Sequence, residues 1–485
     1  MSATRTAPPI ATADPRRWKA LTLLALADFV VILDATIVNI ALPSVGRALH
    51  ASTSELSWVI TVYILAFGGL LMLGGKLADL YGRRLLFIGG LTLFGVASLA
   101  GGLSTSIGEL IVFRALQGVG AAALAPAARS IVTVLFEEGP ERSKALGIWA
   151  AVAGSGSVVG LILGGVLTSA FGWEWVLFVN VPVTLGAAAL APRIMEESRA
   201  ESESRSVDVG GAVLSTGGLV AALYALVNAG DAGWGSPQTL GLLGMAGLLL
   251  TLFVWVESRV ASPLVPLRIF RLPQVRGANI AMVLMAAAMV GMFFILALYQ
   301  QQLQGYSALE SGVSQLPLGL LLITVAGLAG PFTERIGPRP VLVTGTVVLA
   351  LGIGWLSRLP LHGSYLSDIL GPSLLIAVGL GLGFVALTIA SARGVEPGHA
   401  GTAGGLINMT QQVGGALGLA IITAVATSGL HGATPGSAAV DHGFRAALIV
   451  AAGIAAAASV VGALVLPGRK QPKPVVEAAA EGALW

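Results

Sequence analysis

Two acidic residues, Asp28 and Asp34, stand in the otherwise apolar stretch from Leu26 to Pro43. A charge at the centre of a membrane-spanning helix costs about 2.5–3.5 kcal/mol on insertion scales, so such a group faces a cavity or binds a partner. Their spacing turns the two side chains about 120° away from each other on a helix. They cannot both line one narrow stripe, and each therefore needs its own explanation.

Arg114 is the candidate partner for Asp34, because both lie at a similar depth in their apolar segments. We interpret Asp34 as a cavity-facing group that binds protons, a cationic substrate or both, with Arg114 setting the balance between its charged and neutral forms. The alternative is a buried acid held permanently by Arg114. For Asp28 the alternatives are the same proton or substrate chemistry, or a polar vestibule near the helix end.

Other polar, aromatic and sulfur-containing side chains in the apolar segments could complete a pocket. Aromatic faces attract cations, and methionine adapts to the shape of a ligand. The alternative is structural, because Trp and Tyr often anchor helix ends at the membrane surface and amides often link helices. The pocket candidates are Trp58, Tyr63, Gln117, Phe293, Tyr299, Gln301, Asn408, Met409 and Gln411.

The composition places these residues in a membrane. The chain of 485 residues is 55% hydrophobic and only 11% charged, whereas soluble domains average about 25% charged residues. Its apolar runs are about twenty residues long, which fits a spanning helix rather than a barrel strand. With no cysteine and no H-x-x-x-H pair, disulfides, Cys-ligated metals and a helical zinc site are excluded. We expect an all-α membrane protein without a metal or another cofactor.

Fourteen apolar segments are long enough to span a bilayer. They lie at 20–43, 55–78, 84–104, 109–133, 143–170, 173–192, 207–229, 238–257, 275–302, 310–331, 339–358, 367–391, 400–429 and 441–466. The pattern predicts a six-helix half over 20–192, a linker over 193–274 with two inserted helices (207–229 and 238–257), and a second six-helix half over 275–466. Polar tails cover 1–19 and 467–485.

The basic residues indicate the orientation. Of the 27 Lys and Arg residues, all except Arg47, Arg114, Arg358 and Arg445 fall in the tails or in loops on the same side as the tails. Since basic residues concentrate in cytoplasmic loops, we expect both termini in the cytoplasm. The basic N-terminus could begin a signal peptide, but the acidic apolar run after it is too long, so we interpret it as a retained helix. This bias explains the net charge of +3 without a nucleic-acid partner.

One loop motif occurs twice. The segment GGKLADLYGRR returns in outline as AGPFTERIGPR 255 residues later, so that Gly75, Asp79, Gly82 and Arg84 match Gly330, Glu334, Gly337 and Arg339. Glycine permits close packing and tight turns, and an acid can accept hydrogen bonds from a neighbouring helix N-terminus. We interpret the acids and Arg83, Arg84 and Arg339 as a conformational latch; a plain basic turn is the alternative. Repeated halves with a site between them are typical of transporters.

Together with that motif, three stretches resemble a known family: LDATIVNIALP (33–43), RALQGVGAA (114–122) and GWEWVLFVNVP (172–182, where arginine is commoner at Glu174). They resemble the major facilitator superfamily and, within it, the fourteen-helix branch of drug:proton antiporters. The resemblance covers about residues 20–466. It implies the major facilitator fold, a bacterial multidrug or antibiotic exporter, and proton coupling at Asp34.

The fifth apolar segment both follows and departs from that family. Its stretch GSGSVVGLILGGVL is similar to the family's antiporter motif through Gly156, Gly160, Gly164 and Gly165, but Leu161 stands where the family has proline. Glycines let two helices approach closely. The missing proline removes the kink that the family motif implies.

We therefore expect a monomeric, proton-driven secondary exporter of drug-like or antibiotic molecules in a bacterial inner membrane. Its substrate would be small and amphipathic or cationic, and a proton gradient would supply the energy. An exporter or symporter of one endogenous metabolite is the alternative within transport. A membrane enzyme or receptor is a different class, but no span carries a His–Asp pair and no phosphate-binding loop precedes a helix. Without a large soluble domain for ATP, a pump is disfavoured.

Overall fold

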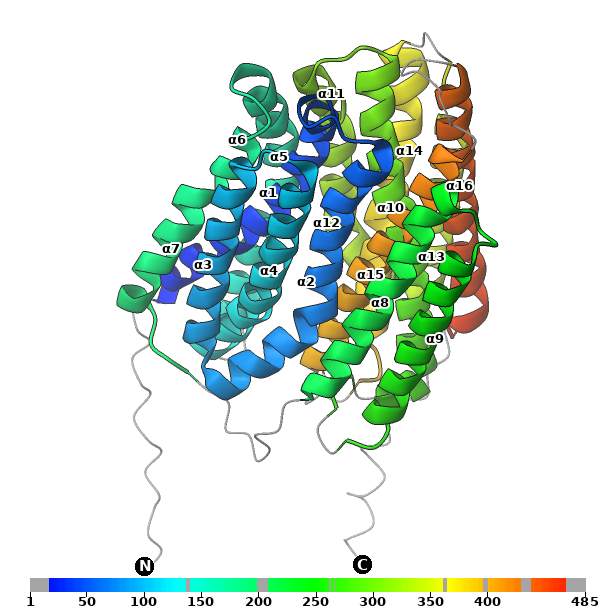
Figure 1. The fold of residues 1–485 in the computed structure, drawn as a ribbon. Coiled ribbons are helices and arrows are strands. Elements are labelled where there is room, and N and C mark those ends of the chain that lie inside the picture. Colours follow the sequence, from blue (N-terminus) through cyan, green and yellow to red (C-terminus); the bar gives the residue numbers. More distant parts are fainter. Residues whose placement is uncertain are drawn as a thin grey trace, which may run out of the picture.

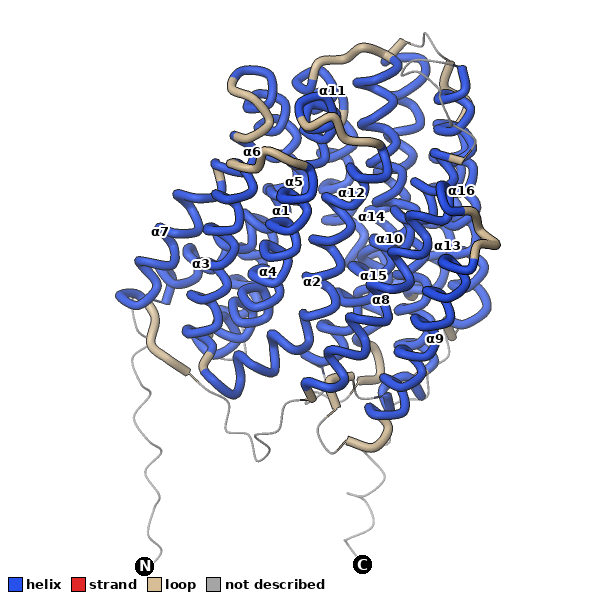
Figure 2. The backbone as a smooth tube through the Cα atoms, in the orientation of Figure 1, coloured by secondary structure: helices blue, strands red, loops and turns tan. Residues whose placement is uncertain are grey.

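The computed structural model of the chain describes residues 17–136, 140–198, 208–260, 263–265, 267–360, 364–395, 400–428 and 438–467. Within these residues the protein is helical and has no strand (Figure 2). The predicted all-α fold is therefore confirmed. Apart from residues 17–19 and residue 467, the two predicted polar tails lie outside the described residues.

Six traverses form the N-terminal half. They are α1 (Arg17–Ala48), α2 (Thr53–Tyr81), α3 (Arg83–Gly102), α4 (Ile107–Leu135), α5 (Pro140–Ala170) and the pair α6 (Trp175–Phe178) and α7 (Asn180–Ile194). Each coincides with a predicted segment, although α1 and α2 begin and end beyond the apolar run. The sixth traverse is broken at Val179, which places Asn180 at the start of α7.

The inserted pair consists of α8 (Val209–Ala232) and α9 (Pro237–Glu257), followed by the short 3₁₀ helix η1 (Leu267–Arg271). The C-terminal half contains α10 (Pro273–Leu298) continued by the π-helix η2 (Tyr299–Leu303), α11 (Ala308–Ser314) with α12 (Leu316–Ile336), α13 (Pro338–Leu356), the π-helix η3 (Tyr365–Leu370) with α14 (Gly371–Ala392), α15 (Ala400–Thr427) and α16 (Ala438–Val465). Thirteen described helices are long and apolar enough to cross a membrane, and α5 contributes a further apolar stretch, Ser155–Ala170.

Local chemistry sets several helix ends. At the starts of α2 and α11, the side chains of Ser52 and Ser307 accept a hydrogen bond from the third helical residue, whose Glu side chain accepts one in return. This reciprocal arrangement satisfies two backbone donors that a helix start leaves free. The repeated loop motif forms the same turn twice, since Gly82 between α2 and α3 has φ +129° and Gly337 between α12 and α13 has φ +92°. Only glycine adopts such φ values easily.

The helices pack into two groups that meet directly through α2 and α15, and the inserted pair lies beside this contact. Helices α1 to α7 contact chiefly one another, as do α10 to α16, while α8 lies against both α2 and α15 (Figure 1). Helix α9 packs on α8 and is otherwise largely exposed. The chain therefore carries its extra helices on the seam between the two groups.

The two ends of this bundle differ. Helix α1 begins and α16 ends at the same end, the lower one in Figure 1, which we call the tail end; the opposite end is the far end. At the far end α5 contacts α11, and Gln301 Nε2 donates a hydrogen bond to the carbonyl oxygen of Ile40, 2.9 Å away. The packing of α5 on α11 and the hydrogen bond from Gln301 to Ile40 thus hold the two halves together at the far end.

Candidate functional site

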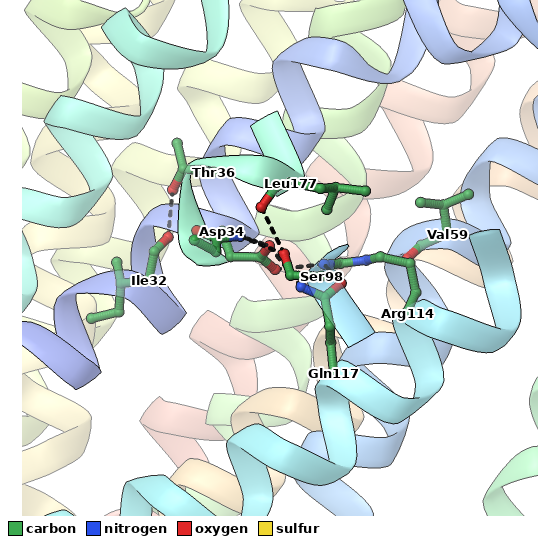
Figure 3. A network of polar contacts seen from close by, with 9 residues as sticks. Ile32, Asp34, Thr36, Val59, Ser98, Arg114, Gln117 and Leu177 are labelled. Atoms are coloured by element: carbon green, nitrogen blue, oxygen red, sulfur yellow. Dashed lines mark hydrogen bonds and ion pairs between the residues drawn. The ribbon is translucent and has the colours of Figure 1, made fainter. Parts of the chain in front are cut away.

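The most extensive buried polar network centres on Asp34, midway along α1. Arg114 Nη1 of α4 lies 2.5 Å from Asp34 Oδ2, and Gln117 Nε2 donates to Oδ1 over 3.3 Å (Figure 3). Asn180 Nδ2, from the start of α7, donates to the same Oδ1 over 2.8 Å. Asp34 and Arg114 are 0% and 1% exposed. The contact predicted between these two residues is present.

Arg114 is held from several sides. Its Nε donates to the carbonyl oxygen of Val59 on α2, 3.2 Å away, and its Nη1 also donates to Gln117 Oε1 over 3.0 Å. The guanidinium carbon lies 4.2 Å from the centre of the Tyr63 ring. A stacked aromatic face stabilises a cation that has lost its water. Tyr63 is therefore part of the network, although its hydroxyl has no hydrogen-bond partner within the described chain.

The sixth traverse supplies contacts that the sequence did not predict. Asn180 Nδ2 also donates to Ser98 Oγ of α3 over 3.2 Å, and Ser98 in turn donates to the carbonyl oxygen of Leu177 over 2.8 Å. Asn180 directly follows the break at Val179, and its side chain joins Ser98 to Asp34. The only signal for this role was a single amide in the apolar stretch WVLFVNVP.

The burial of Asp34 corrects one expectation. A buried ion pair is tolerated when additional hydrogen bonds satisfy both charges, and here three side chains donate to Asp34. Asp34 has no exposed surface, so the prediction that it faces an open cavity is wrong for this conformation. The network instead ties α1, α2, α3, α4 and α7 together in the N-terminal half.

Asp28 has different surroundings. It is half-buried, and its carboxylate accepts no hydrogen bond within the described residues. Arg129 of α4 is the cation that acts on it electrostatically. The two acids of α1 therefore occupy unlike environments, one saturated with donors and the other open.

Several pocket candidates pack elsewhere. Trp58 lies against Tyr224 of α8, with ring centroids 6.0 Å apart. Tyr299 donates to the carbonyl oxygen of Pro360 at the far end, and Gln301 takes part in the far-end closure. Phe293 is partly buried against an apolar cluster with members from both halves, and Met409 against one that α15 and α10 share with η1. These five side chains pack within or between helices, so their predicted place in a central pocket is not seen in this conformation.

The first copy of the latch motif forms contacts, but with other partners than expected. Arg83 Nη2 and Nε donate to Asp79 Oδ1 over 2.9 and 3.1 Å. The N-terminus of α3 is instead capped by Glu197, whose carboxylate accepts from the backbone N–H groups of Arg84 and Leu85. An anion at a helix start is favoured by the helix dipole, and Glu197, after α7, takes the place predicted for Asp79.

The remaining latch residues carry fewer contacts. A Cβ at Gly75 would lie 3.5 Å from Pro126 Cβ of α4, which is ordinary van der Waals contact. Arg84 Nη1 donates to the carbonyl oxygen of Met195 over 3.0 Å. In the second copy, Glu334 is exposed and Arg339 is half-buried, and neither forms an ion pair within the described chain. The two copies of the turn therefore share a backbone shape but not a set of charge contacts.

The fifth-helix glycines form the predicted close contacts. A Cβ at Gly156, Gly160 or Gly164 would fall within 2.8–3.1 Å of α1 backbone oxygens or side chains, so only glycine lets α5 lie this close to the helix that carries Asp34. Gly165 lies against the backbone of Leu309 in α11. Leu161 packs in a small cluster with Ile40 and Ala308. The residue that replaces the family proline thus fills the far-end contact between the halves.

The described residues contain no group of three His, Asp or Glu side chains placed to hold a metal ion. What they contain is a spanning bundle of two helix groups with a buried acid–base network in the first. A family model described as the Major Facilitator Superfamily matches residues 24–419. The chain belongs to this superfamily.

Relatives within the superfamily are similar over nearly the whole chain. The puromycin resistance protein of Streptomyces alboniger is 42% identical over 472 residues, which covers 94% of this chain and 93% of the relative. The cephamycin export protein of Amycolatopsis lactamdurans is 42% identical over 427 residues, covering 87% of this chain and 88% of the relative. The chain is thus a multi-pass protein of the plasma membrane, as predicted.

The fold agrees with a solved structure. The crystal structure of a bacterial homologue of the human lysosomal transporter Spinster matches with a TM-score of 0.69 and 18% identity, covering 94% of this chain and 98% of that one. At this identity the likeness concerns the fold alone. The predicted major facilitator fold, with two extra helices, is confirmed.

Proposed function

We propose that this chain is a proton-driven secondary exporter of antibiotic-like molecules that works by alternating access. The observation that carries the proposal is its similarity, over almost its full length, to superfamily proteins named for puromycin resistance and cephamycin export. A proton gradient is the energy source, without a cofactor or an enzymatic step. The substrate is small and amphipathic or cationic, and the transporter works as a monomer without nucleic acid.

The Asp34 network supports a role in coupling. A carboxylate held by Arg114, Gln117 and Asn180 accepts hydrogen bonds from all three. A proton on Asp34 would cancel its charge and turn one acceptor oxygen into a donor, which removes the reason for Arg114 to remain there. Because the network joins five helices, its loosening would allow them to shift. Proton binding and substrate binding would then each favour a different state of the carrier.

The test uses purified protein in liposomes with an imposed pH gradient. We expect wild type to move both puromycin and a fluorescent lipophilic cation only when the gradient is present. Asp34→Asn should lower that movement at least about tenfold, because an amide carries neither the charge nor a transferable proton. Glu109→Gln, which alters an exposed carboxylate at the far end of α4, is the control and should transport normally.

Two results would contradict this proposal. Gradient-independent movement in wild type would exclude proton coupling. Equal gradient-driven transport by wild type and Asp34→Asn would make the Asp34 network structural and move the coupling role to another acid.

A further inference from the structure

A second pair of opposite charges lies nearer the tail end, between Asp28 of α1 and Arg129 of α4. The two act on each other electrostatically, yet no ion pair or hydrogen bond joins them. In the Asp34 network, by contrast, the two charges are in direct contact and bonded to neighbouring amides. The side chains of Asp34 and Arg114 are therefore hydrogen-bonded within the protein, whereas those of Asp28 and Arg129 have donors and acceptors left for a ligand.

Arg129 is fixed by packing rather than by hydrogen bonds. Its guanidinium carbon lies 5.3 Å from the centre of the Trp149 ring on α5. Trp149 is only 8% exposed, and its indole Nε1 has no acceptor within the described chain. Arg129 itself is exposed. A planar cation laid on an aromatic face keeps its N–H donors free at its edges.

Arg129 also faces the other half of the molecule. A Cβ at Gly404 of α15 would lie 3.6 Å from Arg129 Nη1. Asn408 and Gln411 follow Gly404 at helical spacings of four and seven residues, so they share the face of α15 that meets Arg129. Both amides are half-buried and have no hydrogen-bond partner within the described residues. Polar groups of this kind are normally paired when they leave water.

We infer that Asp28, Arg129, Trp149, Asn408 and Gln411 form a binding site between the halves for a zwitterionic aromatic molecule, one that carries both an ammonium and a carboxylate group. The inference rests on the proposed exporter function, since it names the substrate class that the carrier binds from its tail end. Arg129 would be the group that selects for the carboxylate.

The chemistry of the five side chains matches such a ligand. A guanidinium edge binds a carboxylate through two parallel hydrogen bonds, and Asp28 can accept from an ammonium group. The indole N–H and the two amides can donate to or accept from the polar groups between those charges. A ligand with only a positive charge would be repelled by Arg129 and would carry no group for it to bind. A ligand with only a negative charge would be repelled by Asp28 in the same way. Only a ligand with both charges satisfies both residues.

The experiment measures binding of three matched fluorescent probes to the purified protein in lipid nanodiscs. Nε-dansyl-lysine carries both charges, its methyl ester keeps only the ammonium, and its Nα-acetyl derivative keeps only the carboxylate. We expect wild type to bind the zwitterion about tenfold or more tightly than either derivative, as loss of one charge-assisted contact implies. Arg129→Gln should abolish the preference over the ester, and Asp28→Asn should abolish the preference over the acetyl derivative.

A matched control is available on α9. Arg259 lies over the exposed ring of Trp255, 4.4 Å from its centre, in the same Arg-on-Trp arrangement but outside the site. Arg259→Gln should leave all three affinities unchanged. Arg129→Lys keeps the charge and should retain part of the preference for the zwitterion, which keeps the test valid if Arg129→Gln does not fold.

Each outcome decides between the site and the alternatives. The inference would be overturned if wild type bound the three probes equally. It would also be overturned if the preference for the zwitterion survived both Arg129→Gln and Asp28→Asn. In either case Asp28 and Arg129 would be a charge pair within the protein and not a ligand site. Gradient-driven transport of puromycin and of Nε-dansyl-lysine is measured on the same preparation. Transport without zwitterion preference would refute this site but not the exporter function; the preference without gradient-driven transport would support the site and refute proton-driven export.

Discussion

At the scale of single residues, the Asp34–Arg114 pair makes a prediction about stability. Removing one member of a buried ion pair leaves a charge without compensation, which costs about 3–5 kcal/mol. We therefore expect Arg114→Leu and Asp34→Leu each to lower the thermal unfolding temperature clearly. The double variant should lose less of its unfolding temperature than the two single variants lose together, because it contains no buried charge without a partner. Thermal unfolding of the purified protein in detergent measures all three.

The surface pair Arg17–Glu141, with an N–O distance of 2.9 Å, is the comparison for this experiment. An exposed pair contributes about 0–1 kcal/mol, and Glu141 is the exposed member of this one, so Glu141→Gln should change the unfolding temperature little. If the losses at Asp34 and Arg114 simply add in the double variant, the two side chains do not depend on each other and the network is not a single unit.

Residue types and helical spacing were enough to pair Asp34 with Arg114 and to place Gln117 beside them. The sequence could not tell which neighbouring helix a given face would meet. Trp58 was therefore predicted to line a pocket, whereas its face of α2 meets the inserted helix α8. Arg129 was counted only as a basic residue of the tail side, although the predicted segment 109–133 contains it, because the sequence does not show that this face of α4 meets α5 and α15.

At the scale of helices, Gly312 of α11 makes a prediction about the far-end contact. A Cβ at this position would fall on the carbonyl oxygen of Leu161 in α5, so the backbones must separate to accommodate it. Overpacking of this kind costs about 1–3 kcal/mol. We expect Gly312→Ala to lower thermal stability and to slow transport, since the far end can no longer close fully. Unfolding temperature and gradient-driven transport in liposomes measure the two effects.

Gly319, two turns further along the same traverse, serves as the control. A Cβ there would lie 3.4 Å from Val158 and 3.6 Å from Leu161, which is ordinary contact. Gly319→Ala should therefore behave as wild type. If Gly312→Ala and Gly319→Ala had the same unfolding temperature and transport rate, α5 and α11 could separate at little cost. Their contact would then not determine closure of the far end.

Hydropathy located all fourteen traverses, because a run of about twenty apolar residues has no other stable place than a membrane. Interruptions within the traverses were not predictable in the same way. The break at Val179 occurs inside an apolar stretch, and the π-helix from Tyr299 to Leu303 covers the polar sequence YQQQL, which by itself does not indicate a change of helix type. Glu197 was likewise missed as the cap of α3, since it lies more than a hundred residues from the turn it stabilises.

At the scale of the whole molecule, the contacts between halves are unequal along the bundle. The far end is closed by α5 against α11 and by Gln301 against Ile40, while the tail-end site keeps Arg129 exposed between α4 and α15. This difference fits a carrier whose binding site is accessible from the tail end. The inserted helix α8 contacts both α2 and α15, so it must shift with one half relative to the other during any exchange of access.

The chain contains no cysteine, so single-cysteine variants can report both orientation and exchange of access without background. Gly404→Cys places a thiol beside Arg129 in ordinary contact, and Gly108→Cys places one in open space at the far end of α4. If the tail end is cytoplasmic, as the basic loops indicate, a membrane-impermeant maleimide added to intact cells should label Gly108→Cys. The same reagent should label Gly404→Cys at least about tenfold faster in inside-out vesicles than in intact cells, because only the vesicles expose the tail end to the reagent.

Exchange of access adds a second expectation for the same variants. Substrate and proton each stabilise the state that they bind better. Since a proton on Asp34 would loosen the network of the present state, a pH gradient that makes the lumen of inside-out vesicles acid should slow labelling of Gly404→Cys as the tail end closes. Gly108→Cys in right-side-out vesicles should label at an unchanged rate, because a Cβ at this position meets nothing within 4 Å at the start of α4. A labelling rate of Gly404→Cys that does not change with the gradient would contradict alternating access. Faster labelling of Gly404→Cys in intact cells than in inside-out vesicles would mean that the tail end is not cytoplasmic.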